Sequence, residues 1–161
     1  MRRGVAGLLA TLLLAPALVA CGGNADGESG SSEEKAGEHE LESAADRSVC
    51  RADAHPVDKP YAEGFPSSWV FPQDTTVYDV EDRDGTGVIV TAVSSTPFRE
   101  ILDFLNHDAV DAGFRVTNGE TEEHDAEANW TSGDQEGRWA IRESADCPGE
   151  TVIQVFAAAS S

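Results

Sequence analysis

Apolar and polar side chains alternate along most of the chain after residue 74, which is the period of half-buried β-strands. Six runs have this character or are rich in β-branched residues: Thr75–Val80, Gly87–Ser94, Phe114–Asn118, Asp125–Ser132, Gly137–Ser144 and Thr151–Ala158. The last run carries large apolar residues on both faces, namely Val152, Ile153, Val155 and Phe156. We therefore expect it to be a central strand that is buried on both sides.

A helical period occurs between Thr96 and Ala112. Thr96 is the expected N-cap, Pro97 the expected first helical residue and Gly113 the expected stop. The residues that recur at helical spacing are Phe98, Ile101, Leu102, Leu105, Ala109 and Ala112. They form one apolar stripe, which predicts a helix packed on the sheet.

The order of elements is therefore ββαββββ, and the sequence predicts an α+β fold with a single helix on an antiparallel sheet. Asp84-Gly85 between the first two strands is a strong hairpin signal. One helix covers only one face of such a sheet, so the other face is expected to be solvated or used for binding. Before the first strand, residues 51–74 contain four X-Pro pairs, which favour an extended lead-in whose aromatic side chains dock on the domain: Tyr61, Phe65, Trp69 and Phe71.

The N-terminus predicts export. Arg2 and Arg3 precede an uncharged, Leu-rich stretch over residues 4–20, which is typical of a signal peptide. The end of this stretch, Leu18-Val19-Ala20-Cys21, resembles the lipobox of bacterial lipoproteins. That resemblance implies cleavage before Cys21 and a diacylglycerol on its sulfur; the alternative is an ordinary secretory signal. The arginine pair leaves the secretory and twin-arginine routes both open.

Residues 21–48 follow as an acidic, low-complexity segment with eight acidic and two basic residues. Such a composition predicts a disordered tether, within which residues 33–45 favour a short helix. The remaining residues, 49–161, are expected to form one domain. The whole chain has a formal net charge of −19. This charge argues against nucleic acid as a partner, because phosphate binding needs Lys and Arg.

Two cysteines remain once Cys21 is assigned to the lipid. An even pair in an exported chain predicts a disulfide between Cys50 and Cys147, with two free thiols as the alternative.

The strongest candidate for a metal site is an acidic hairpin made of Asp79, Glu81, Asp82 and Asp84. Asp82-x-Asp84-Gly85 matches part of an EF-hand loop, but Val80 and Thr91 occupy the two end positions, where oxygen ligands are needed. The hairpin is thus at most a weak calcium site, and a solvated turn is the default interpretation. We expect no resident metal or cofactor.

Trp130 and Trp139 lie on adjacent predicted strands. They either stack a sugar or aromatic ligand on an open sheet face or pack beneath the helix, and packing is favoured because aromatic residues dominate small cores. The chain lacks G-x-S-x-G, H-E-x-x-H and phosphate-loop motifs, so no catalytic residues are assigned and no enzymatic activity is expected.

The lipobox, the acidic tether, the segment from Phe65-Pro66 to Phe71-Pro72, the hairpin, Ala112-Gly113-Phe114 and the C-terminal strands together resemble small lipoproteins of high-GC Gram-positive bacteria. The resemblance implies anchoring and fold but no activity. We expect a lipid-anchored protein on the extracytoplasmic face of the membrane, acting as a non-enzymatic module that binds an envelope protein or a cell-wall ligand. The alternative is a receptor for a small ligand or, weakly, for calcium.

Overall fold

The computed structural model describes residues 48–160, so the predicted signal peptide, Cys21 and nearly all of the predicted tether lie outside the described residues. The elements within this range are β1 (Thr75–Asp82), β2 (Val88–Ser94), α2 (Phe98–Asn106), α3 (Asp108–Asp111), β3 (Arg115–Thr121), β4 (Asp125–Ser132), β5 (Gln135–Glu143) and β6 (Thr151–Ala159). The mixture of one sheet with short helices agrees with the predicted α+β class.

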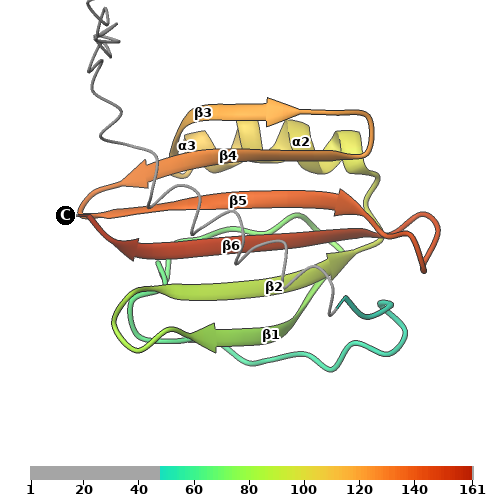
Figure 1. Cartoon of the computed structure of the whole chain (residues 1–161), viewed down its shortest axis with the longest axis horizontal. Coiled ribbons are helices and arrows are strands. Elements are labelled where there is room, and N and C mark those ends of the chain that lie inside the picture. The colour runs from blue at the N-terminus through green and yellow to red at the C-terminus, as the bar shows by residue number, and fades with distance from the viewer. Residues whose placement is uncertain (1–47, 161) are drawn as a thin grey trace, which may run out of the picture.

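The strands form one antiparallel sheet in the order β1-β2-β6-β5-β4-β3. β6 lies between β2 and β5, which is the central position that its apolar pattern predicts (Figure 1). α2 and α3 lie together on one side of the sheet, behind β3 and β4 in the view of Figure 1. We call this side the helix side and the opposite side the outer face.

The hairpin between β1 and β2 turns at the predicted Asp84-Gly85 pair. Both residues have positive φ, 49° and 88°, and the Thr86 amide donates to the Arg83 carbonyl at 3.1 Å. Two central residues with positive φ define a type I′ turn, whose twist matches that of the strands.

The predicted single helix is wrong in detail, because it divides at His107 into α2 and α3. The His107 ring nitrogen Nδ1 lies 2.9 Å from the Asp103 carbonyl oxygen. Local bonding of this kind competes with a regular helical backbone. The predicted stop at Gly113 is confirmed: its φ is 99°, and the Phe114 amide donates to the Ala109 carbonyl at 3.0 Å, as in a Schellman motif.

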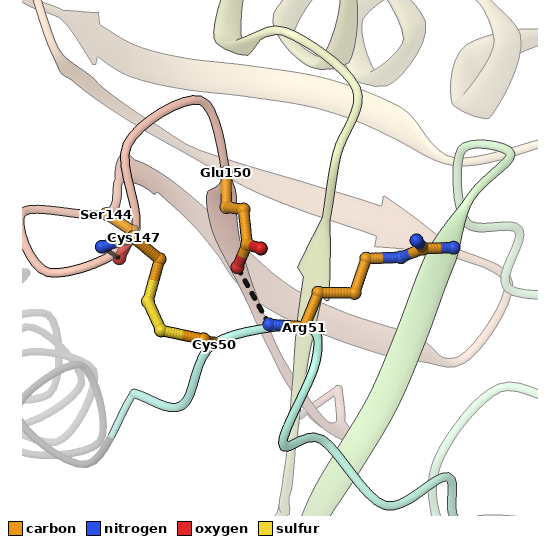
Figure 2. The surroundings of a disulfide bond; sticks show 5 residues. All are labelled: Cys50, Arg51, Ser144, Cys147 and Glu150. Carbon is orange, nitrogen blue, oxygen red and sulfur yellow. Dashed lines mark hydrogen bonds between the residues drawn. A yellow bond between two sulfur atoms is a disulfide. The ribbon is translucent and has the colours of Figure 1, made fainter.

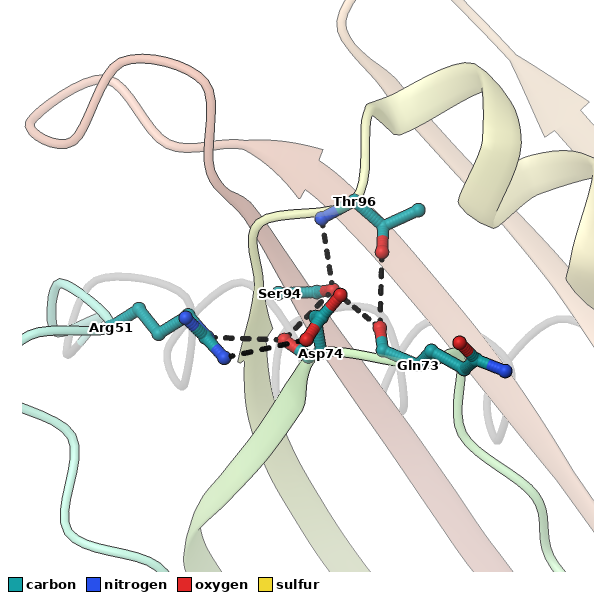
Figure 3. Close-up of polar contacts among 5 residues, drawn as sticks. All are labelled: Arg51, Gln73, Asp74, Ser94 and Thr96. Carbon is teal, nitrogen blue, oxygen red and sulfur yellow. Dashed lines mark hydrogen bonds and ion pairs between the residues drawn. The ribbon is translucent and has the colours of Figure 1, made fainter.

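The predicted start of the helix is also wrong. Pro97, not Thr96, occupies the N-cap position, and it makes no side-chain cap hydrogen bond. The Thr96 hydroxyl instead donates to the Gln73 carbonyl at 3.0 Å (Figure 3). The buried Ser94 hydroxyl accepts a hydrogen bond from the Thr96 amide at 3.1 Å and lies 3.3 Å from the Asp74 carbonyl. The segment before α2 is therefore fastened to the end of the lead-in.

The helix side holds the main core. Trp69 of the lead-in packs against Phe114 and Trp130, with ring centroids 4.7 and 5.1 Å away. Phe65 lies edge-on to Trp69 with ring centroids 6.3 Å apart, and Tyr61 lies 5.7 Å from Phe65. The prediction that the aromatic residues of the lead-in dock on the domain is thus confirmed, and they bury the part of the sheet that the two short helices do not reach.

Cys50 and Cys147 form a disulfide bond across a sequence separation of 97 residues, as predicted (Figure 2). Next to it, the Arg51 amide donates to the Glu150 carboxylate at 2.8 Å. The Arg51 side chain in turn donates from Nε to the Asp74 carbonyl at 3.1 Å (Figure 3). The start of the described chain is therefore held beside the loop that leads into β6.

Candidate binding face of the sheet

The outer face carries an apolar strip along the two central strands. Register pairs Ile89 with Phe156, Thr91 with Gln154 and Val93 with Val152. The alternate residues of β2 and β6, such as Val90 and Val155, belong to the helix-side core. We call the six outer residues the outer strip: Ile89, Thr91, Val93, Val152, Gln154 and Phe156.

Five of the six outer-strip residues are buried and Phe156 is partly exposed, even though α2 and α3 lie on the other side of the sheet (Figure 1). Ile89, Val93 and Val152 are 1%, 0% and 5% exposed, and they do not belong to the helix-side core. The two polar members at the centre, Thr91 and Gln154, are 2% and 3% exposed. The Thr91 hydroxyl has no hydrogen-bond partner among the residues that the structure describes. This is an apolar surface with a small polar centre, and it is not built for contact with water.

Ion pairs border the outer strip. On the β5 side, Arg138 pairs with Glu127, and Arg142 lies 3.7 Å from Asp125. Arg138 stands opposite Phe156 in the register, and Arg142 stands opposite Val152. An apolar centre with a charged rim is the usual anatomy of a protein–protein contact.

On the β1 side, Glu81 pairs with Arg83 at 3.2 Å. This ion pair uses one carboxylate of the acidic hairpin. A second, that of Asp82, accepts a hydrogen bond from the Asp84 amide at 3.1 Å. Between residues 48 and 160, the group of three potential metal ligands that converge is Cys50, Cys147 and Glu150, and its two sulfurs form the disulfide. The structure does not bring the carboxylates of the acidic hairpin together.

Trp130 and Trp139 both face the helix side and are each 1% exposed. Neither ring is available to stack a ligand, so their position is the one given by the packing alternative. Tyr61 lies at the edge of the same core, and burial raises the pKa of its phenol. These aromatic residues stabilise the fold and do not line a site on the outer face.

In the described range, no helix is long and apolar enough to cross a membrane. Comparison of the chain with protein-family models, curated proteins and solved structures finds no match. The two-sided apolar pattern of the last strand is the one signal of the outer strip in the sequence, and no pattern indicates that this strand pairs with β2.

Proposed function

We propose that this protein is a lipid-anchored extracytoplasmic module that binds a partner of the cell envelope through the outer strip. The single observation that carries the proposal is the apolar surface of β2 and β6 on the face away from the helices. An antiparallel sheet with one solvated face carries polar residues on that face. Four of the six outer-strip residues are instead large and apolar, which favours contact with protein over contact with water.

The anchor supports an envelope location. The residues that resemble a lipobox would place a diacylated Cys21 at the membrane, and two acyl chains are sufficient for stable anchoring. The acidic segment that follows would hold the domain away from lipid headgroups. Residues 49–161 contain 22 acidic and seven basic residues, so this domain repels an anionic bilayer surface and favours a protein or cell-wall ligand. Because Phe156 is partly exposed and the other five outer-strip residues are buried, partner binding requires that these five become accessible.

Affinity capture with matched variants tests this function. The chain from residue 21, with Cys21→Ser so that it remains in solution, is immobilised and exposed to envelope extract at physiological and at high salt. Phe156→Lys places a charge on the outer strip, and Val110→Lys places the same charge on α3, where Val110 is 41% exposed. Phe156→Lys should release a species that the parent chain and Val110→Lys both retain at high salt.

Retention by all three chains, or retention at low salt only, would contradict the proposal. Electrostatic attraction to the acidic domain is screened by salt, whereas an apolar contact persists. Near-ultraviolet circular dichroism of the three buried tryptophans checks that both variants keep the helix-side core.

A further inference from the structure

The two edges of the sheet differ in how far they are covered. β3 forms one edge, and among residues 48–160 no strand lies beyond it (Figure 1). Six of its seven residues are exposed. At the other edge, the Val57 amide donates to the Val77 carbonyl of β1 at 2.9 Å, which brings the lead-in alongside that strand. Because an uncovered edge offers unpaired amides and carbonyls, β3 is the edge of the described chain that is open to an additional strand.

The hydrogen bonding between β3 and β4 shows which main-chain groups face this open edge. Where β3 turns into β4, the Glu122 amide donates to the Asp125 carbonyl at 2.8 Å. In an antiparallel pair of strands, hydrogen-bonded and non-hydrogen-bonded residue pairs alternate. Counted along β4, this alternation directs the amides and carbonyls of three β3 residues away from β4: Val116, Gly119 and Thr121.

Two opposite charges on β3 lack an ion-pair partner. Within residues 48–160, no salt bridge involves Arg115 or Glu120. Glu120 instead stands directly opposite Glu127 of β4, and like charges at opposite positions destabilise a sheet. Both side chains lie on the outer face, because Arg115 precedes Val116 of the helix-side core and Glu127 lies between two residues of that core. Each charge is therefore available to a strand that pairs with β3.

We propose that β3 pairs antiparallel with β3 of a second copy of this chain, so that the two sheets become continuous. A twofold axis at the middle of β3 places Val116 opposite Gly119 of the second copy, which joins main-chain groups that face the open edge in both chains. The irregular step of β3 between these two residues then lies opposite itself. The same register places Arg115 opposite Glu120 of the second copy, and the symmetry forms this ion pair twice.

This contact uses a different surface from the proposed function and does not depend on it. β4 and β5 lie between β3 and the outer strip. The acidic excess of the domain opposes association at low salt. At physiological ionic strength the Debye length is about 8 Å, so repulsion between distant charges is screened more than the attraction of adjacent Arg115–Glu120 pairs. Dimerisation should therefore be measured at physiological salt.

Sedimentation velocity on residues 21–161 carrying Cys21→Ser tests the pairing over a series of protein concentrations. The parent chain should pass from monomer to dimer as its concentration rises. Arg115→Glu and Glu120→Arg, each made alone, convert both ion pairs of the dimer into like-charge pairs. Each variant should therefore dimerise at least about ten-fold more weakly than the parent. Near-ultraviolet circular dichroism of the buried tryptophans checks that both variants remain folded.

A mixture of the two variants gives the sharpest result. Arg115→Glu mixed with Glu120→Arg should form a heterodimer as readily as the parent forms its dimer, since every pair across the contact then joins opposite charges. On α2, Arg99→Glu and Glu100→Arg repeat the same two changes in charge away from β3 and should not weaken the parent dimer.

Three results would overturn the proposal. The first is a parent chain that stays monomeric at every concentration, in which case the edge of β3 would be open only to a strand of another protein. The second is a dimer that both single variants keep, since the contact would then lie elsewhere on the domain. The third is a mixture of Arg115→Glu and Glu120→Arg that stays monomeric.

Discussion

The disulfide should contribute a large share of the stability of the domain. Replacing both cysteines, Cys50→Ala with Cys147→Ala, opens a loop that spans a sequence separation of 97 residues. Loop-closure entropy for about 100 residues corresponds to about 4.7 kcal/mol at 25 °C. Small domains have total unfolding free energies of about 5–15 kcal/mol, so this loss is a third of the stability or more.

The loss of stability should come from the greater conformational entropy of the unfolded chain, because the folded structure keeps other contacts near the disulfide. Arg51 still binds Glu150 through its amide and Asp74 through its side chain. The sheet and the helix-side core do not contain either sulfur. We therefore expect the double variant to fold with the same near-ultraviolet spectrum as the parent domain.

Urea unfolding followed by tryptophan fluorescence measures the effect, since Trp69, Trp130 and Trp139 are all buried. With a slope of about 2 kcal/mol per molar urea, the midpoint should fall by about 2 M. The parent chain treated with a thiol reductant should match the double variant, and the double variant should not respond to reductant. A loss below about 1 kcal/mol would refute the argument from loop entropy.

Three further outcomes are expected. Gly137→Ala places a methyl group 2.6 Å from the Trp130 ring and against the Phe156 carbonyl, so the free energy of unfolding in urea should fall by about 1–3 kcal/mol; an unchanged midpoint would contradict this packing. Calcium at 10 mM should leave the melting temperature within about 1 °C of a sodium chloride control of equal ionic strength, since a millimolar site in the acidic hairpin would add about 1.4 kcal/mol, or several degrees. In cells that export the chain, Cys21→Ser should abolish radiolabelling with palmitate and release the protein from the membrane fraction; a labelled or membrane-bound variant would exclude Cys21 as the anchor.

The strands could be predicted from the sequence because the apolar and polar pattern within each strand follows which of its faces are buried. Alternation in β4 and the continuous apolar run in β6 located both strands to within a residue, and Asp84-Gly85 located the first turn. The division of the helix at His107 could not be predicted from the periodicity, since the apolar stripe continues through it to Ala109. The division coincides with a non-helical backbone at His107, whose φ is −124°.

The candidate site was harder to predict than the fold. Apolar residues on both faces of β6 indicated two covered faces, but the outer strip forms only when β6 inserts between β2 and β5. That pairing joins Val93 to Val152 across the whole helical segment, and no local pattern encodes it. Conversely, the acidic hairpin was the candidate metal site in the sequence because of its charge, whereas in the structure one of its carboxylates pairs with Arg83.

Site-specific photo-crosslinking tests the central claim, that the outer strip is the surface that meets a partner. A photoreactive group is introduced into the anchored full-length chain as Phe156→p-benzoylphenylalanine, which changes the aromatic ring least, and Phe104→p-benzoylphenylalanine on α2 is the matched control. An intermolecular adduct of one defined mass is expected from position 156 and none from position 104. Equal adducts from both positions, or no intermolecular adduct from position 156, would contradict it.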